Sequence, residues 1–366
     1  LAIPLFIFTG LIMLRSGVAR RLVDFALSLV GHLPGGLGIA MVLTMGFFAA
    51  FSGSILAAIT AVGTIMMPEM IAKGYSRTFT VTLAAAAGLL EALIPPSNAA
   101  IIYSSLTGVP VSRTFAAGVL PGGVLMIVLI LLVLWRCRDM AREPRMSGEV
   151  RRRAFVAAIP GLMTPFIILG GIYGGFLTPS ESAAVASVWA IFVGFAIHRE
   201  LKFSAIWSAL RDTAVTTSVI FAIIATATFL SVVLTYTQAP QHMTSYFVGF
   251  GANGITFLLI VGVIVLILGT FIEIIPNFYL MVPIFMVVAA KLGVSLEHLY
   301  IVFTAFAGLG MLTPPVCVGL YTASGVINLS ADKAFKEVPL FLAVGIVYGV
   351  LMIFIPALAT WLPSLL

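Results

Sequence analysis

The sequence predicts an all-α polytopic membrane protein, and two observations support this fold class. Of 366 residues, 61% are hydrophobic and only 9% are charged, and the mean hydropathy is +1.19. Soluble domains are about 45–50% apolar and about 25% charged, so this chain could not cover a water-facing surface. Apolar runs of the length that crosses a bilayer, about 20 residues for roughly 30 Å, also recur along the chain. Only two cysteines occur, Cys137 and Cys317, and they read as small buried apolar residues that carry no information on redox compartment.

The chain begins inside an apolar segment. Residues 1–6 read Leu-Ala-Ile-Pro-Leu-Phe, with no initiating Met and no basic stretch of a cleavable signal before them. We therefore expect residues 1–14 to be a truncated helix, and the chain to be a fragment or to have an engineered start.

Uninterrupted and interrupted apolar segments follow one another along the chain. Uninterrupted helices are predicted at 113–135, 154–176, 179–197, 214–235 and 337–363. The interrupted segments form two re-entrant hairpins, 36–72 and 253–292, and two broken helices, 78–108 and 297–326. At 1.5 Å per residue, each piece of an interrupted segment spans about half to three-quarters of a membrane. The expected domains are a first repeat over 1–135, a basic linker over 136–153, and a second repeat over 154–366.

The distribution of basic residues favours this membrane topology. If both hairpins return to their own side and both broken helices cross, 17 of the 19 Lys and Arg residues fall on one side. Only Arg113 and Lys291 fall on the other side, and making either hairpin a full crossing would spoil the split. Cytoplasmic loops carry the Lys and Arg excess, so the basic side is predicted to be cytoplasmic.

The basic linker and the net charge of +6 follow from this topology. A positive-inside signal with attraction to anionic lipid headgroups accounts for both. A lipid bilayer is therefore the expected partner, and no nucleic-acid partner is expected.

The two halves carry matching motifs at a nearly constant offset along the chain. Leu93-Ile94-Pro95-Pro96-Ser97 in the first half corresponds to Leu312-Thr313-Pro314-Pro315 in the second, and each is followed by a tyrosine-led stretch with hydroxyl side chains. In the predicted threading, the first hairpin enters from the cytoplasm and the second from outside, so the repeat is inverted. Inverted repeats with discontinuous helices near the midplane are typical of secondary transporters.

The Pro-Pro breaks suggest the chemistry of a binding site. Proline lacks the N–H donor and clashes with the preceding turn, so a Pro-Pro pair frees backbone carbonyls at membrane depth. Hard cations such as Na⁺ suit carbonyl and hydroxyl oxygens. The half-helix that starts at Ser97, or at Val316, presents a partial positive charge to an anion. A cation site beside an anion site is what a cation-coupled carboxylate carrier needs.

The hairpin tips add hydroxyls and carboxylates at the same depth. The first tip reads Ser52-Gly53-Ser54, and the second, residues 269–277, contains Glu273, which could bind Na⁺ or carry a proton. Glu91 is the other deep carboxylate, and its alternative interpretation is a partner for a backbone N–H or a hydroxyl. The predicted substrate-binding residues are Ser52, Ser54, Glu91, Ser97, Asn98 and Thr313. The predicted sodium-binding residues are Ser52, Gly88, Pro95, Ser97, Gly269, Glu273, Gly308, Gly310, Thr313 and Pro315.

An enzyme is not expected. The four histidines, His32, His198, His242 and His298, are far apart in the sequence, and no His-Glu-x-x-His or Gly-x-Ser-x-Gly motif occurs. Na⁺ is the only metal expected, as a coupling ion. A passive channel is disfavoured because hairpin tips in an inverted repeat suit alternating access.

With these motifs the sequence resembles the large membrane subunit (DctM-like) of tripartite ATP-independent periplasmic (TRAP) transporters. The resemblance covers essentially the whole chain, in order. It rests on Ala2-Ile3-Pro4-Leu5-Phe6, Ser52-Gly53-Ser54, Ile94-Pro95-Pro96-Ser97, Ala117-Gly118-Val119-Leu120-Pro121-Gly122, the Gly170–Glu181 stretch and Leu312-Thr313-Pro314-Pro315.

The resemblance implies Na⁺-driven import of an organic acid across the bacterial inner membrane by an elevator-like transport domain. It also implies two partners, a soluble periplasmic binding protein and a small four-helix membrane subunit, and about fifty missing N-terminal residues. A stand-alone sodium/dicarboxylate symporter without a binding protein is the alternative.

The sequence departs from the family pattern in three respects. Ala57 and Ala58 stand where an acidic residue usually follows the first tip, Glu91 stands where Gly is common, and Glu273 replaces a usual Asp. We therefore expect a carboxylate to have moved from one wall of the site to another.

Overall fold

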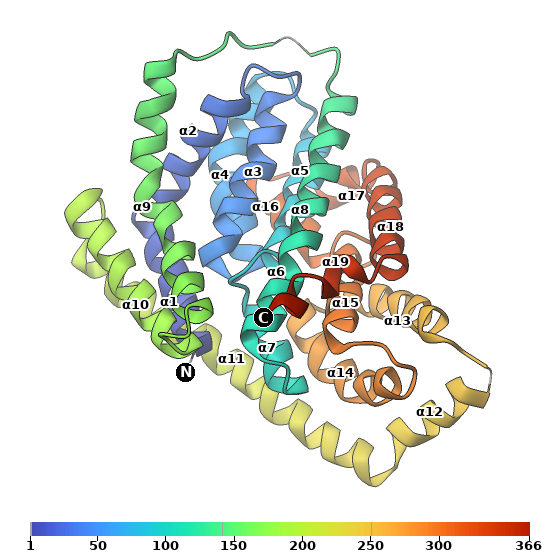
Figure 1. Cartoon of the computed structure of the whole chain (residues 1–366). Helices are drawn as coiled ribbons and strands as arrows, with labels where there is room; N and C mark the ends of the chain where they lie inside the picture. The colour runs from blue at the N-terminus through green and yellow to red at the C-terminus, as the bar shows by residue number, and fades with distance from the viewer. Residues whose placement is uncertain (1, 141, 250) are drawn as a thin grey trace.

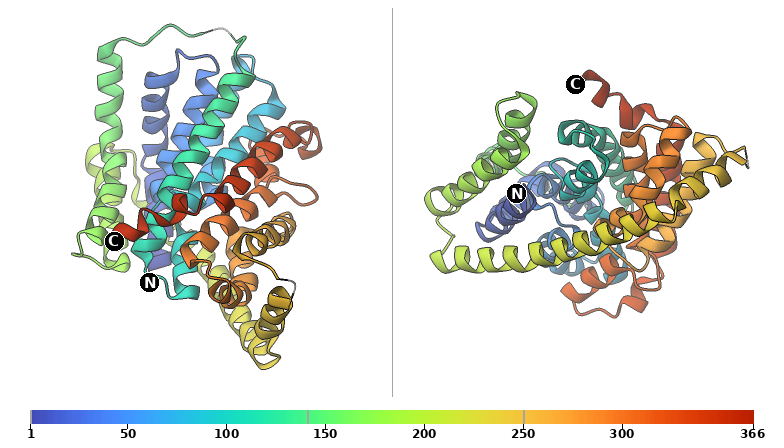
Figure 2. Two further views of the ribbon diagram at one scale, coloured as in Figure 1. Left: turned by 45° about the vertical axis from the view of Figure 1, so that its right-hand side comes forward. Right: turned by 90° about the horizontal axis from the view of Figure 1, so that it is seen from below.

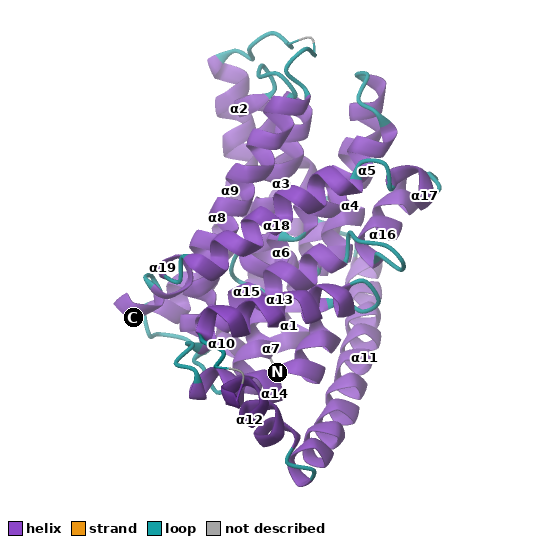
Figure 3. Ribbon diagram, turned by 90° about the vertical axis from the view of Figure 1, so that its right-hand side faces the viewer, coloured by secondary structure: helices purple, strands orange, loops and turns teal. Residues whose placement is uncertain are grey.

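The computed structural model describes residues 2–140, 142–249 and 251–366. Within these ranges the regular elements are all helices, as Figure 3 shows, which confirms the all-α prediction. Among the described residues, six helices are long and apolar enough to cross a membrane, or up to eight if two bent pairs each count as one span.

The first half of the chain contains eight helices among its described residues. They are α1 (Ala2–Arg15), α2 (Val18–Val30), α3 (Gly36–Ser52), α4 (Ile55–Ala72), α5 (Arg77–Gly88), α6 (Leu90–Leu93), α7 (Asn98–Thr107) and α8 (Val111–Arg136). The hairpin predicted at 36–72 is the α3–α4 pair, and the broken helix predicted at 78–108 is α5, α6 and α7.

The second half follows the basic linker. Its helices are α9 (Gly148–Tyr173), α10 (Pro179–Phe192) with a π-helical extension (Val193–Ile197), α11 (Phe203–Tyr236), α12 (Ala239–Gly249), α13 (Gly254–Gly269), α14 (Ile274–Lys291), α15 (Leu296–Gly310), α16 (Val318–Val326), α17 (Ala331–Ala334), α18 (Val338–Phe354), α19 (Ala357–Thr360) and a terminal 3₁₀ turn (Pro363–Leu365). The second hairpin is α13–α14, and the second broken helix is α15–α16.

Two predicted boundaries are wrong. The helix expected over 337–363 ends at Phe354, because Ile355 precedes Pro356 and leaves the helical region with φ −120° and ψ 75°. The helix expected from residue 214 begins at Phe203 instead. The amphipathic helix α2 was not predicted. It follows α1 after a bend of 69°, at Gly17 in the left-handed conformation.

The internal repeat is confirmed element by element. Helices α4 and α14 both have 18 residues, and they begin at Ile55 and Ile274. The same offset separates the serine caps of α5 and α15. Ser76 Oγ accepts the N–H of Phe79 at 3.0 Å, and Ser295 Oγ accepts the N–H of His298 at 3.3 Å. The Pro95–Pro96 and Pro314–Pro315 peptide bonds, both cis, are separated by the same offset.

The two copies run in opposite directions. Lys73, in the loop before α5, pairs with Glu143 in the linker that follows the C-terminal end of α8. In contrast, Glu297 at the start of α15 pairs with Arg113 at the N-terminal end of α8, at 2.8 Å. The 26 residues of α8 span about 39 Å, so the two broken helices start from opposite ends of the molecule. In Figure 1, α7 accordingly lies beside α14, and α16 lies beside α4 and α5.

Aromatic and hydroxyl contacts join the copies at their centre. The ring of Tyr103 on α7 lies 5.0 Å from that of Tyr300 on α15 and 5.4 Å from that of Phe278 on α14. The Tyr103 hydroxyl donates to the carbonyl of Leu296 at 2.7 Å, a contact across the repeat boundary.

A second group of helices flanks this body. Helix α1 packs against α10 and α11, and α2 packs against α3 and α9. Figure 2 shows α9 and α10 standing to one side, while α11 runs from them along one edge of the hairpin body toward α12. Contacts of α1 with α3 and of α11 with α14 place both flanking helices against the hairpins.

Candidate functional site

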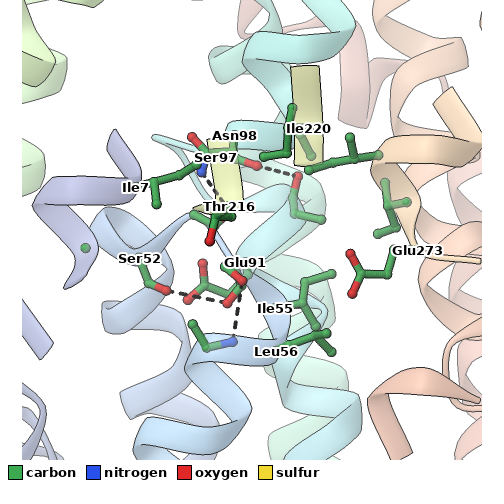
Figure 4. Close-up of a pocket in the computed structure, with 18 of the residues that line it drawn as sticks. Ile7, Ser52, Ile55, Leu56, Glu91, Ser97, Asn98, Thr216, Ile220 and Glu273 are labelled. Carbon is green, nitrogen blue, oxygen red and sulfur yellow. Dashed lines mark hydrogen bonds between the residues drawn. The ribbon is translucent and has the colours of Figure 1, made fainter. Parts of the chain in front are cut away.

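A cavity of about 400 Å³ lies where both hairpin tips meet the flanking helices (Figure 4). Its walls are α1, the α3–α4 tip, the break between α6 and α7, α11, and the α13–α14 tip. The inverted repeat therefore brings both tips and the first Pro-Pro break to one place, as the sequence predicts.

The first tip is a short turn between two helices. Helix α3 ends at Ser52, and Gly53 follows with φ 64°, a left-handed conformation that a side chain would disfavour. Ser54 is extended and caps α4, since its Oγ accepts the N–H of Ala57 at 3.4 Å. The tip thus exposes two hydroxyls and free backbone groups toward the cavity.

At the first break, protein hydroxyls satisfy the carbonyl that proline leaves free. The carbonyl oxygen of Ala92 accepts from Ser97 Oγ at 3.2 Å and from the Tyr300 hydroxyl at 2.7 Å. Tyr300 belongs to the second copy, so that copy completes the break of the first.

Asn98, the first residue of α7, ties the break to the tip. Its amide donates to the carbonyl of Gly53 at 3.0 Å, while its Oδ1 is buried and has no hydrogen-bond partner among the described residues. Cys317 is the counterpart of Asn98 in the second copy, and its backbone N–H donates to the carbonyl of Thr270, also at 3.0 Å. Each half-helix start is therefore bonded to its own hairpin tip.

Two carboxylates border the cavity. Glu91 is 1% exposed and lies beside the Ser52 hydroxyl and the backbone N–H groups of Gly53 and Ser54. Neither of its oxygens makes a hydrogen bond of ordinary geometry within the described part of the chain. Glu273 is half-buried at the N-cap of α14 and makes no capping bond with its side chain. Figure 4 shows both side chains at the cavity, Glu91 from α6 of the first broken helix and Glu273 from the tip of the second hairpin.

The residues that line the cavity include no Lys, Arg or His. A third acidic residue, Asp212 of α11, is already paired with Arg15 of α1 at 2.5 Å. Glu91 and Glu273 are the lining carboxyl groups without an ion pair in the described ranges, so the cavity has an acidic lining that no basic side chain balances.

The flanking helices supply apolar walls that the sequence analysis missed. Ile7 and Leu11 of α1 and Val219 and Ile220 of α11 line the cavity, with Thr216 as a polar side chain on the α11 wall. Gly10 brings α1 against the first tip, because a Cβ there would lie 2.8 Å from the carbonyl oxygen of Ser52.

Six of the predicted site residues line the cavity, and these are Ser52, Ser54, Glu91, Ser97, Asn98 and Glu273. The remaining predicted residues lie elsewhere, and these are Gly88, Pro95, Gly269, Gly308, Gly310, Thr313 and Pro315. Gly88 and Gly308 pack against side chains of Ile59 and Leu89. Gly269 and Gly310 are in close backbone contact, since a Cβ at Gly310 would lie 2.5 Å from the carbonyl carbon of Gly269.

Thr313 and Pro315 show how the second break differs from the first. The Thr313 hydroxyl donates to the carbonyl of Leu309 at 2.8 Å, and Pro315 is exposed, whereas Pro95 is buried. Any sodium ligation at these positions is separate from the central cavity and stays a prediction.

The described residues contain no cluster of three His, Cys, Asp or Glu side chains that could hold a metal. His198 and His298 each contact a backbone carbonyl instead, those of Ser16 and Met352. The hydroxyl and carbonyl oxygens of the first tip are donors of the kind that hard cations prefer.

Comparison with known proteins places the chain among membrane transport proteins. Residues 1–358 match the family described as the tripartite ATP-independent periplasmic transporter, DctM component. The chain is 37% identical over 367 residues to the C4-dicarboxylate TRAP transporter large permease protein DctM of Pseudomonas aeruginosa, covering 100% of this chain and 86% of that protein. It is 33% identical over 365 residues to the isethionate TRAP transporter permease protein DctMQ of Oleidesulfovibrio alaskensis, covering 98% of this chain and 57% of that protein.

A solved structure has the same fold. The YdaH transporter of Alcanivorax borkumensis superposes with a TM-score of 0.65 at 13% sequence identity, over 96% of this chain and 84% of that one.

Proposed function

The chain belongs to the family of DctM components of tripartite ATP-independent periplasmic transporters, and on this basis we propose that it imports a small organic acid by sodium symport. Large permeases of this family are multi-pass membrane transporters, in keeping with the six to eight apolar spans of the chain.

The acidic lining of the central cavity, with no basic side chain, is the observation that carries the proposed coupling. An organic anion that enters it meets Glu91 and Glu273 and no lining basic side chain. At about 4 Å, two like charges repel by roughly 4 kcal/mol at an effective dielectric constant of 20. Bound cations remove this repulsion, so substrate binding is expected to require them.

The first tip fits a sodium ion. Glu91 Oε1, Glu91 Oε2 and Asn98 Oδ1 are buried oxygens without hydrogen-bond partners among the described residues, and both side chains contact the Ser52–Ser54 tip. Together with the Ser52 hydroxyl, they form an all-oxygen donor set of the kind that hard cations prefer. In this proposal Na⁺ binds first and orders the tip, and the substrate then binds a completed site between the two hairpins.

The proposed movement is of the elevator type. The hairpins and broken helices would carry the site as one body along α1 and α11, with the bend at Gly17 as a joint. In keeping with the charge distribution of the sequence, the end of the molecule that carries the basic linker would face the cytoplasm in the bacterial inner membrane.

The proposed partners are a periplasmic binding protein that delivers the substrate and a small membrane subunit that braces the flanking helices. Exposed apolar side chains on α9 and α10, such as Phe166 at 70% and Val188 at 68%, suit contact with lipid or with such a subunit. The relatives are named for C4-dicarboxylates and for isethionate, so the proposed substrate class is a small organic anion.

Sodium-gradient uptake into proteoliposomes tests the proposal. The native permease is reconstituted with and without its binding protein and small subunit, and C4-dicarboxylates, sialate, keto acids and sugar acids are compared. Uptake that requires the binding protein and an inward sodium gradient is the expected result. Uptake without the binding protein would favour a stand-alone symporter, and uptake independent of sodium would contradict the coupling.

A further inference from the structure

A second, more open cavity of about 620 Å³ adjoins the central one. Leu14 of α1 and Leu56 and Ala57 of α4 line both cavities. The two spaces are therefore neighbours, with two leucine side chains at their junction.

The second cavity leads along α4 toward the basic linker. Ala57, Thr60, Ala61 and Thr64 line it at helical spacing, so they share one face of α4 over about 10 Å. Helix α4 continues beyond them to Lys73, which pairs with Glu143 of the linker. The cavity thus extends from the tip toward the end of the molecule where the linker lies.

Two threonines on this face of α4 are polar groups in an otherwise largely apolar lining. The side chains of Thr60 and Thr64 are exposed, and each hydroxyl donates to the carbonyl four residues earlier, at 2.8 and 2.6 Å. Their hydroxyl oxygens keep lone pairs that can accept from water. With Arg20, they give the cavity polar groups that can hold water.

One arginine at the mouth of the cavity has no ion pair among the described residues. Of the three arginines around the α1–α2 bend, Arg15 pairs with Asp212 at 2.5 Å and Arg21 pairs with Glu200 at 2.7 Å. Arg20 is exposed, lines the second cavity, and has no carboxylate at ion-pair distance in the described part of the chain. Its positive charge contrasts with the acidic lining of the central cavity.

We propose that the second cavity is a water-filled exit for the transported acid, and that Arg20 forms a second, transient binding station for its carboxylate. The assignment of the acid as cargo rests on the proposed function. Asp24, one turn further along α2, interacts with Arg20 by electrostatic attraction and not by a hydrogen bond. The N–H donors of the Arg20 guanidinium are therefore available to an anion. A substrate that has lost its sodium ions is repelled by Glu91 and Glu273 and attracted toward Arg20, so these charges set the direction of release.

Thiol labelling tests the cavity without requiring transport. A cysteine is introduced by Thr64→Cys, and the two native cysteines, Cys137 and Cys317, are buried. Labelling rates are compared for an anionic methanethiosulfonate, carrying a sulfonate, and a cationic one, carrying a trimethylammonium group. Rapid labelling by the anionic reagent is expected, whereas Val347→Cys, on an α18 side chain that is 70% exposed to the proposed lipid phase, should label slowly.

Arg20 is then replaced in the Thr64→Cys background. Arg20→Gln should lower the anionic-to-cationic rate ratio about fivefold or more, because a nearby unit charge acts oppositely on the two reagents. Arg142→Gln, an exposed linker arginine with no ion pair among the described residues, should leave the ratio unchanged. Absence of labelling at Thr64→Cys, as for a lipid-filled crevice, or an unchanged ratio in Arg20→Gln, would overturn the proposal.

Uptake by the same variants separates this inference from the proposed function. Arg20→Gln should lower the maximal uptake rate at least threefold without changing the sodium dependence, and Arg20→Lys should restore most of it. If no variant and no native protein takes up any acid while the labelling ratio still depends on Arg20, the proposed substrate fails and the anion-attracting exit stands. Normal uptake by Arg20→Gln would reject the binding station.

Discussion

The side-chain amide of Asn98 donates a hydrogen bond of 3.0 Å to the backbone carbonyl oxygen of Gly53. This bond fixes the first hairpin tip to the start of the half-helix behind the Pro-Pro break. It also orients the other end of the amide, Asn98 Oδ1, which is buried and has no partner among the described residues. The tip and the break are therefore one unit, and a ligand at either is expected to order both.

Asn98→Ala should weaken sodium binding. Losing the bond to Gly53 and one oxygen ligand is expected to cost about 1–3 kcal/mol, which raises the half-saturating sodium concentration about fivefold or more. The sodium dependence of uptake measures this. Asn253→Ala is the matched control, since it removes the cap of α13, a bond of 2.9 Å far from the cavity lining. An equal shift in both variants would mean general destabilisation instead.

Glu91→Gln should impair coupling more than it impairs folding. The variant removes a buried charge but keeps the shape of the side chain, so the permease should fold while its affinity for Na⁺ falls about tenfold or more. Sodium-driven uptake and thermal unfolding of the purified protein are measured together. Glu69→Gln, an exposed glutamate at the end of α4, should behave as the native protein does. Equal sodium-dependent uptake by Glu91→Gln and the native permease would count against a role for Glu91.

Gly10→Ala should slow transport by crowding the first tip. The added methyl would lie 2.8 Å from the Ser52 carbonyl oxygen, and such overpacking costs about 1–3 kcal/mol. The initial rate of uptake is the measurement, with expression in the membrane checked in parallel. Gly123→Ala on α8, where nothing lies within 4 Å of the new methyl, is the control and should transport normally. A normal rate in Gly10→Ala would show that the close contact between α1 and the first tip does not limit transport.

Replacing sodium with choline at constant ionic strength should weaken substrate binding to the permease. Without bound cations the acid faces Glu91 and Glu273, and we expect its Kd to rise at least tenfold, about 1.4 kcal/mol. Calorimetric titration of the purified permease with its acid measures the change. An unchanged Kd in sodium-free buffer would contradict the order in which the ion binds before the substrate.

Local chemistry explains which parts of this site could be predicted from the sequence. A Pro-Pro pair interrupts a helix, so the breaks at Pro95-Pro96 and Pro314-Pro315 could be predicted from the sequence. Ser52-Gly53-Ser54 has the composition of a turn, so the first tip could be predicted as well. Ser97 and Asn98 adjoin the break and were found with it.

The flanking walls could not be predicted in the same way. Helices α1 and α11 show little contrast between their faces, so the sequence pattern does not indicate that Gly10 and Thr216 turn toward the hairpins. The opposite holds for α2, whose buried and polar faces differ clearly. Its pattern was present at residues 18–30, but its length falls short of a membrane span and the helix was overlooked.

The contacts of Tyr103 with Leu296 and of Tyr300 with Ala92 have a consequence for biogenesis. Each repeat donates a hydroxyl hydrogen bond to a backbone carbonyl of the other, across 193 and 208 residues of chain. After the ribosome has delivered the first repeat, the Ala92 carbonyl has the 3.2 Å bond from Ser97 Oγ but still lacks the 2.7 Å bond from the Tyr300 hydroxyl. The break of the first repeat therefore gains its shorter hydrogen bond only once α15 is in place, and its packing is completed late, when the second repeat assembles against it.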